Sequence, residues 1–171
     1  MKKIASVCCL CLLSAFLIFG CVDQKKTDTV KFPVILYFAS SEYIQTGDES
    51  IPPLITTRNN IYCEEGEQYE ALLVMLHSVP DELKGAETAI TDKIKFRMIK
   101  VSDKTAYVDV DSKGLSGGSL EEGLFISQIV NSLRGSFDEI EEVQFLVDGK
   151  MTESLMGHYD ASRAYTEGIY Q

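Results

Sequence analysis

The run Phe32-Pro33-Val34-Ile35-Leu36-Tyr37-Phe38 tells most about the fold expected of this chain. Its β-branched and aromatic side chains are apolar at both odd and even positions, so both faces of the strand that they predict are covered. Such a strand belongs in the middle of a sheet. A polar loop rich in turn residues is expected over 39–53, and a shorter strand over 54–58.

One helix and a hairpin are expected further along the chain. Tyr69, Leu72, Leu73 and Leu76 fall at helical spacing and predict a helix from Glu67 to about Ser78. The connection over 81–92 carries no periodicity and is expected to be mobile. Apolar and polar residues then alternate over 94–98 and over 106–110, which predicts an antiparallel hairpin across a short turn.

A second helix and a last strand complete the pattern. After a glycine and serine loop over 111–118, Ser119 and Glu122 have the spacing of a capping box, and Gly135 suits the residue after a helix. Val143, Phe145 and Val147 predict a strand that ends in the turn signal Asp148-Gly149. The sequence therefore predicts an α+β, two-layer sandwich with two helices on one face of a mixed β-sheet of about five strands.

The N-terminal segment reads as an export signal. Lys2 and Lys3 precede a run without charges from Ile4 to Gly20, which is the layout of a secretory signal peptide. An uncleaved membrane span is the alternative, although seventeen residues are at the short limit for crossing a bilayer.

Ile18-Phe19-Gly20-Cys21 resembles a bacterial lipobox, in which the cysteine is acylated and becomes the mature N-terminus. Residues 1–20 are then a lipoprotein signal peptide, Cys21 is the lipid attachment site, and 21–31 is a polar tether. Two or three acyl chains give stable anchoring where one is marginal. We expect a protein held at the extracytoplasmic face of the cell membrane. Of the five cysteines only Cys63 lies in the exported domain, where a buried, unreactive thiol is expected.

The charge balance excludes two classes of partner. The chain has 16 Lys+Arg and 26 Asp+Glu, and removal of residues 1–20 leaves 14 basic against 26 acidic residues, a net charge of −12. Binding to nucleic acid depends on Lys and Arg that neutralise phosphates, and adsorption to anionic lipid depends on basic clusters. No nucleic acid is expected as a partner.

Several of these segments together resemble the GerMN domain of exported bacterial lipoproteins. The resemblance covers about 34–162 and rests on Val34-Ile35-Leu36-Tyr37-Phe38, Thr57-Arg58, Leu72-Leu73, Tyr107-Val108-Asp109-Val110, Val143 to Gly149, and Gly157-His158-Tyr159-Asp160-Ala161-Ser162. It implies a link to sporulation and spore germination, a place in envelope assemblies, and no established catalytic residues. We expect a GerMN-like domain over 32–162 and a flexible tail over 163–171.

Three kinds of chemistry are weighed against this interpretation. Gly114-Leu115-Ser116-Gly117-Gly118 matches the nucleophile motif of serine hydrolases, with Ser116 and His158 as the residues required, but its serine does not join strand directly to helix. The possible metal ligands His77, His158, Cys63 and the pair Asp109 and Asp111 lack the short spacings of a zinc site. Tyr159, Tyr165 and Tyr170 suggest a sugar platform, but the chain has no Trp.

The leading expectation is a non-catalytic, lipid-anchored interaction module that assembles or positions a cell-envelope complex, without a catalytic residue, metal or cofactor. Sheet edges are the expected contact surfaces, because a partner strand can be added there. The alternative is a lipoprotein that binds a cell-wall fragment or small solute in a pocket lined by 39–53 and residues around Tyr62. A small serine hydrolase is the least favoured function.

Overall fold

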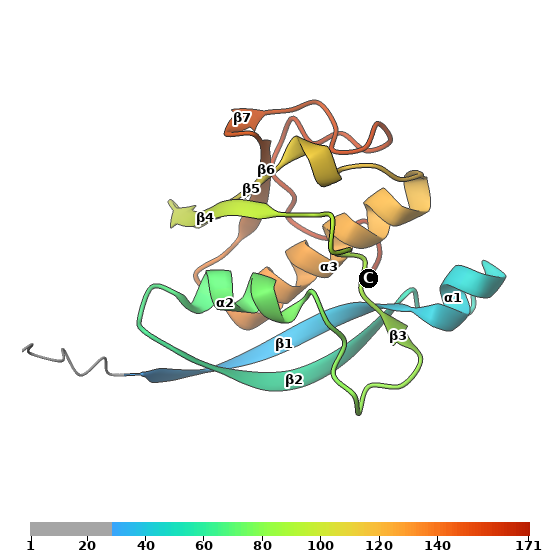
Figure 1. Cartoon of the computed structure of the whole chain (residues 1–171), viewed down its shortest axis with the longest axis horizontal. Helices are drawn as coiled ribbons and strands as arrows, with labels where there is room; N and C mark the ends of the chain where they lie inside the picture. Colours follow the sequence, from blue (N-terminus) through green and yellow to red (C-terminus); the bar gives the residue numbers. More distant parts are fainter. Residues whose placement is uncertain (1–28) are drawn as a thin grey trace, which may run out of the picture.

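Two β-sheets enclose the two longer helices in the computed structural model, which describes residues 29–171 (Figure 1). The elements are β1 (Val30–Ser40), α1 (Ser41–Thr46), β2 (Leu54–Cys63), α2 (Gln68–Met75), β3 (Ala86–Glu87), β4 (Phe96–Ser102), β5 (Thr105–Val110), the 3₁₀ turn η1 (Ser112–Gly114), α3 (Ser119–Ser136), β6 (Glu142–Val147) and β7 (Lys150–Met151). The expected α+β class is confirmed.

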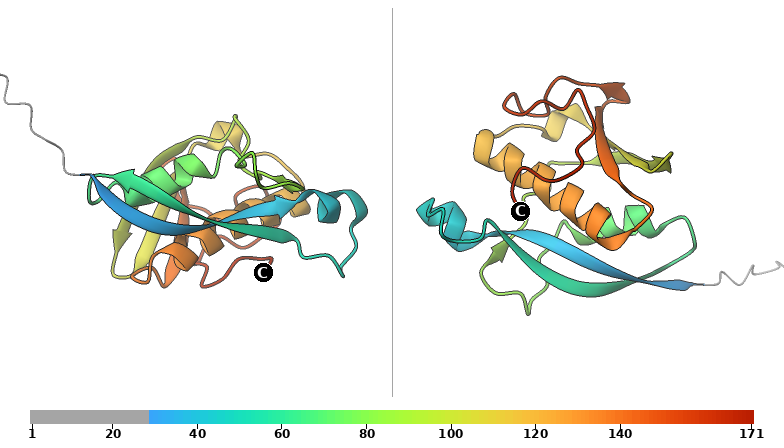
Figure 2. Two further views of the ribbon diagram at one scale, coloured as in Figure 1. Left: turned by 90° about the horizontal axis from the view of Figure 1, so that it is seen from below. Right: turned by 180° about the vertical axis from the view of Figure 1, so that it is seen from behind.

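The strands divide between two sheets, where the sequence pattern suggested one. The first sheet has the order β2-β1-β3 and is antiparallel, and the second has the order β4-β5-β6-β7. The second sheet is mixed, because β5 and β6 are parallel and are joined through α3, while the outer pairs are antiparallel. In Figures 1 and 2, α2 and α3 lie between the two sheets. The helices thus cover the inner face of each sheet.

α3 is buried on almost every side, whereas the sequence pattern predicted a helix with a single buried face. Twelve of its eighteen residues are buried, and they include Glu122, Gln128 and Ser132. Each of these polar side chains is satisfied by hydrogen bonds. Glu122, for example, accepts from the backbone N–H groups of Leu155, Met156 and His158 at 2.7–3.0 Å. Buried polar groups of this kind are tolerated when they are paired.

The hairpin β4–β5 confirms the alternating pattern, with Asp103 and Lys104 at positive φ in the turn between the strands. Other boundaries differ from expectation. β1 begins at Val30, inside the expected tether, and β2 continues to Cys63, five residues past Arg58. The connection expected to be mobile carries β3, which pairs with β1 at Ala39 and Ser40.

One short helix was missed, and the start of another was misplaced by one residue. Residues 39–53 contain α1, whose first turn is capped by the Ser40 hydroxyl, which accepts from the N–H of Tyr43. The N-cap of α3 is Gly118 rather than Ser119, and Glu121 accepts from its N–H at 3.0 Å. Glu122, expected to take that role, turns into the core.

The expectation of a flexible tail over 163–171 was wrong. Tyr165 exchanges two backbone hydrogen bonds with Val143, and the N–H of Tyr170 donates to Ser127 at 2.8 Å. Gly168 lies so close to α3 that a Cβ there would come within 2.8 Å of the Ser127 Cα. The tail therefore belongs to the folded domain.

The predicted signal peptide, Cys21 and most of the predicted tether lie outside the described residues. Among residues 29–171, no helix combines the length and apolar character needed to cross a membrane.

Candidate functional site

One edge of the first sheet is closed by α3. On the side of β1 away from β2, the N–H of Tyr37 donates to the Ser132 hydroxyl at 3.0 Å and the N–H of Ile35 donates to the Ser136 hydroxyl at 2.9 Å. The Ser136 hydroxyl in turn donates to the carbonyl oxygen of Ile35. Two serines one turn apart on α3 thus take the place of a neighbouring strand.

The direction of these bonds fixes which residues of β1 face β2. In an antiparallel pair, the backbone polar groups of successive residues point alternately to one side and to the other. The backbone groups of Ile35 and Tyr37 point toward α3. Those of Val34, Leu36 and Phe38 therefore point toward β2, where these residues pair with Asn59, Thr57 and Ile55. Pro33, which has no N–H, falls at a position that faces away from β2.

The same alternation shows that β2 has an open outer edge. Thr56, Arg58, Asn60 and Tyr62 lie opposite odd-numbered residues of β1, so their backbone N–H and C=O groups point away from β1. No described strand pairs with β2 on that side. Unpaired edges of this kind invite pairing with another chain, and proteins usually cover them.

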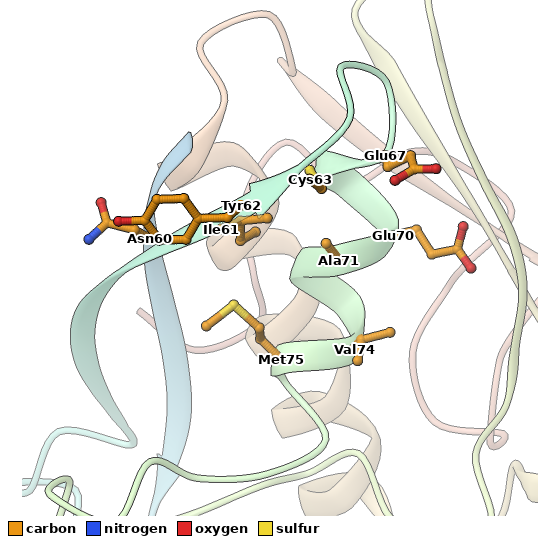
Figure 3. A pocket seen from close by; sticks show the side chains of 9 residues that line it. All are labelled: Asn60, Ile61, Tyr62, Cys63, Glu67, Glu70, Ala71, Val74 and Met75. Atoms are coloured by element: carbon orange, nitrogen blue, oxygen red, sulfur yellow. The ribbon is translucent and has the colours of Figure 1, made fainter. Parts of the chain in front are cut away.

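A groove of about 640 Å³ runs along the end of this open edge (Figure 3). Four consecutive residues of β2 line it, so both faces of the strand contribute and the groove follows the edge of β2. The opposite wall is one face of α2. The lining residues are Asn60, Ile61, Tyr62, Cys63, Glu67, Glu70, Ala71, Val74 and Met75.

The groove combines exposed apolar side chains with negative charge. Tyr62 is 65% exposed and Val74 is 63% exposed, which is unusual for large apolar residues in a folded domain. Figure 3 shows Tyr62 on the β2 side and Glu67, Glu70 and Val74 on the α2 side, with Ala71 between them. Among the described residues neither carboxylate takes part in an ion pair, and no Lys or Arg lines the groove.

Cys63 lies at the end of this groove, beside the start of β1, where it pairs with Val30. Its partial burial, with a smaller contribution from the negative charge of Glu67, raises the pKa of the thiol above its usual value. A nucleophilic cysteine needs the opposite shift. Cys63 is thus partly buried where full burial was expected, and the direction of its pKa shift is that of an unreactive thiol.

The two residues of the expected hydrolase are not assembled into a catalytic pair. His158 Nε2 lies 3.3 Å from the carbonyl oxygen of Gly117, and the described residues contain no hydrogen bond between this ring and Ser116. The segment between β5 and α3 also contains the 3₁₀ turn η1, so Ser116 does not lie on a direct turn from strand to helix.

The predicted metal ligands are also dispersed. Asp109 accepts from Arg97 at 3.2 Å and from the N–H of Gly149 at 2.8 Å, while Asp111 caps η1. His77 packs edge-on against Phe96, and its burial lowers its pKa. Within residues 29–171 no three His, Cys, Asp or Glu side chains gather in a way that could hold a metal ion.

The C-terminal tyrosines pack internally and do not form an exposed platform. Tyr165 packs against Phe145 and donates to the carbonyl oxygen of Asp160, and Tyr170 packs against Tyr43. Burial raises the pKa of Tyr165 to about 12. These contacts do not support a sugar-stacking role.

Only part of the groove lies where the sequence predicted a binding pocket. Tyr62 lines it as expected of the ligand-binding alternative, whereas residues 39–53 contribute none of the lining. The α2 wall was missed because nothing local in the sequence places Glu67 and Val74 beside the edge of β2. The sequence gives no signal for it, because Leu72, Leu73, Val74 and Met75 are uniformly apolar and the exposure of Val74 is seen only in the structure.

Solved structures with the same arrangement define the class of this domain. The first GerMN domain of the sporulation protein GerM from Bacillus subtilis matches with a TM-score of 0.59 at 10% identity, over 81% of this chain and 97% of that one. The tandem GerMN domains of the same protein match with a TM-score of 0.55 at 17% identity, over 85% of this chain and 47% of that one. The fold is therefore that of a GerMN domain.

A protein from Clostridium perfringens described as a candidate lipoprotein also shares the fold, with a TM-score of 0.53 and 18% identity over 79% of this chain and 87% of that one. No curated protein matches significantly. Residues 35–153 match the Germane family, described as sporulation and spore germination, and the chain belongs to this family. The resemblance inferred from the sequence is thereby confirmed.

Proposed function

We propose that this protein is a lipid-anchored, non-catalytic interaction module that binds another envelope protein at the extracytoplasmic face of the membrane and positions it in a complex. The observation that carries this proposal is the open edge of β2 beside an exposed apolar groove. Folded domains usually protect such edges, and an exposed apolar patch rimmed by polar residues is typical of an interaction site.

The anchor is supported by sequence. Ile18-Phe19-Gly20-Cys21 follows an apolar run and precedes a polar segment that leads directly into β1. The fold is shared with a Clostridium perfringens protein described as a candidate lipoprotein. The family description supports a role connected with sporulation or germination.

The anchor is tested by processing at Cys21. We expect the wild-type chain, expressed in a bacterium with lipoprotein processing, to incorporate labelled palmitate and to accumulate as a precursor in globomycin. Cys21→Ser should do neither, while Cys63→Ser should behave as the wild type. Incorporation of label into Cys21→Ser would contradict the assignment of the lipid site.

The interaction role is tested by photo-crosslinking in intact cells, with the full chain carrying benzoylphenylalanine at single surface positions. A protein module is expected to give a discrete adduct with one envelope protein. Binding of peptidoglycan fragments without any protein adduct would favour the ligand-binding alternative. Turnover of a cell-wall substrate, abolished by Ser116→Ala, would favour the hydrolase instead.

A further inference from the structure

We infer that the groove between β2 and α2 binds an extended peptide segment that contains Lys or Arg and that pairs with β2 as an additional strand. This inference rests on the proposed function, because it specifies the chemistry of the partner that the module binds.

The edge of β2 offers backbone hydrogen-bonding groups along the groove. Along the groove, Asn60 and Tyr62 turn their backbone groups outward, and together they offer a partner two N–H donors and two C=O acceptors. The N–H of Asn60 already donates to Oδ1 of the adjacent Asn59 at 2.8 Å, so the other three groups remain for an incoming strand. Addition of a strand to an exposed edge is a recurrent mode of peptide recognition.

The position of the groove and its apolar surface also suit an extended strand. The groove lies between the end of β2 and α2, so an extended occupant aligned with it lies beside the edge of β2. Tyr62 on one rim and Val74 on the other stand more than half exposed. Because side chains of an added strand alternate, every second residue of the occupant would contact this apolar surface.

The negative charge of the groove favours a basic occupant. Glu67 and Glu70 are the charged residues of the lining, and the turn before α2 adds the exposed Glu64 and Glu65. Arg58, further along the open edge, and Lys31, which lies opposite Tyr62 on β1, are both outside the lining. Glu70 also borders a smaller cavity that includes Arg97, but Arg97 is paired with Asp109 and Asp148. An occupant with Lys or Arg at one or two positions would neutralise carboxylates that lack partners within the described chain.

The β4 edge of the second sheet differs from the β2 edge in its charge and regularity. β4 also lies at an edge, but it carries Lys95, Arg97 and Lys100 along or beside it and a break in register near Arg97. Charged residues and bulges are common protection against unwanted pairing. Met98, which is 50% exposed on β4, therefore serves as a control position for crosslinking.

The first test places benzoylphenylalanine at Tyr62, Val74 or Met98 of the full chain in intact cells, and maps each adduct by mass spectrometry. We expect adducts at Tyr62 and Val74 with a segment that contains Lys or Arg and alternating apolar residues, and none at Met98. An adduct restricted to Met98, or one that maps to an acidic segment, would overturn this inference and leave the proposed function intact. The absence of adducts at every surface position would overturn both.

The second test separates strand pairing from side-chain contact. With the crosslinker at Val74, Tyr62→Ala and Tyr62→Pro both remove the phenol ring, but only the proline also removes the outward N–H. We expect the proline variant to give about tenfold less adduct than the alanine variant, as for the loss of one well-formed hydrogen bond. Equal yields would overturn the strand pairing. Equal melting temperatures of the two variants would show that both are folded.

The third test uses a synthetic copy of the mapped segment and the full chain in detergent. Replacement of both carboxylates, Glu67→Gln with Glu70→Gln, should weaken binding about three- to tenfold at low ionic strength, and the difference should shrink near 0.5 M salt, where the Debye length is only about 4 Å. Bound peptide should also slow the amide exchange of Tyr62 and leave that of Ile61 unchanged, since Ile61 already faces β1. An unchanged Tyr62 amide would contradict the inference.

Discussion

The two edges of the first sheet differ in whether their backbone groups are paired: the β1 edge is closed and the β2 edge is open. On the β1 side, Ser132 and Ser136 of α3 bond the N–H of Tyr37 and both backbone groups of Ile35, and β3 pairs with Ala39 and Ser40. On the β2 side, no described strand pairs with the outward backbone groups, and a groove separates α2 from the edge of the strand. The closed edge faces the core and the open edge faces solvent.

This contrast shows that an edge can be closed by hydroxyl groups on a helix, without another strand. A serine hydroxyl both donates and accepts, so Ser136 satisfies the N–H and the C=O of Ile35 at once. These serine hydrogen bonds occur at the edge of β1 that packs against α3, where an unpaired backbone group would lie away from water. The chain leaves the other edge unpaired, where water or a partner can satisfy the same groups.

The largest expected effect distinguishes inward from outward backbone groups on β2. Thr56 and Thr57 are adjacent and identical in type, but by alternation only the N–H of Thr57 donates to β1. Thr57→Pro should lower the free energy of unfolding by about 3 kcal/mol, because it removes a ladder bond and leaves the Leu36 carbonyl without its partner. Thr56→Pro should change it by about 1 kcal/mol or less, since proline is tolerated where the N–H points to solvent.

Urea unfolding of both variants measures this difference, with Thr56→Ala and Thr57→Ala as controls for the lost side chain. Equal destabilisation by the two prolines would mean that the alternation is assigned incorrectly, and with it the open edge.

The next effect concerns the closed edge. Ser132→Ala combined with Ser136→Ala should cost about 2 kcal/mol of unfolding free energy, most of it from Ser132, whose side chain is fully buried. Amide exchange of Tyr37 should accelerate by more than that of Leu36, because only Tyr37 depends on the serine hydroxyl. A loss below about 0.5 kcal/mol, the size of an ordinary surface substitution, would contradict the assigned role of these serines.

A smaller effect concerns His77, which lies two residues past the end of α2. Burial, together with the charge of Lys95, lowers the pKa of His77 from its usual 6.5, while Asp92 opposes this shift. The folded protein then binds fewer protons than the unfolded chain as the pH falls through 6.5. Its stability should therefore decrease on acidification until the pH lies below the lowered pKa.

Urea unfolding between about pH 7.5 and 5.5 should show this loss in the wild type and a flatter profile in His77→Gln. Parallel profiles would show that His77 does not contribute to the pH dependence.

The smallest effect concerns the reactivity of Cys63, which lines the groove. Because burial and the charge of Glu67 raise the pKa of the Cys63 thiol, little thiolate is present near pH 8 and alkylation should be slow. Glu67→Gln removes the charge contribution and should accelerate alkylation of Cys63 by iodoacetamide a few-fold, as followed by peptide mass spectrometry. Glu87→Gln, which also removes one exposed carboxylate but lies on β3, is the matched control and should leave the rate unchanged.

Local pattern predicted most of the individual elements, because alternation and helical spacing are properties of short segments. The hairpin β4–β5, the strand β6 and both longer helices were found in this way. The short helix α1 was missed, although Ser40 as N-cap and Gly47 in the left-handed conformation at its end are recognisable signals. The two-residue strand β3 has no local signal, since it exists only through its pairing with β1.

The division into two sheets and the groove depend on contacts between distant segments. Val34 and Val108 have the same apolar character in the sequence, but they belong to different sheets. Tyr62 was singled out as a possible ligand contact, whereas its counterpart Val74 was not, because α2 reads as an ordinary core helix. What the sequence could not supply was the distance between the edge of β2 and the helix beside it.

The pairing of Val30 with Cys63 places the entry of the chain into the domain next to the groove. With Cys21 acylated as proposed, the nine residue steps from Cys21 to Val30 reach at most roughly 30 Å. The open edge would then sample only a thin layer above the bilayer. Any partner anchored in the same membrane would meet it at a high effective concentration, so that even a weak pairing with β2 would be populated in the cell.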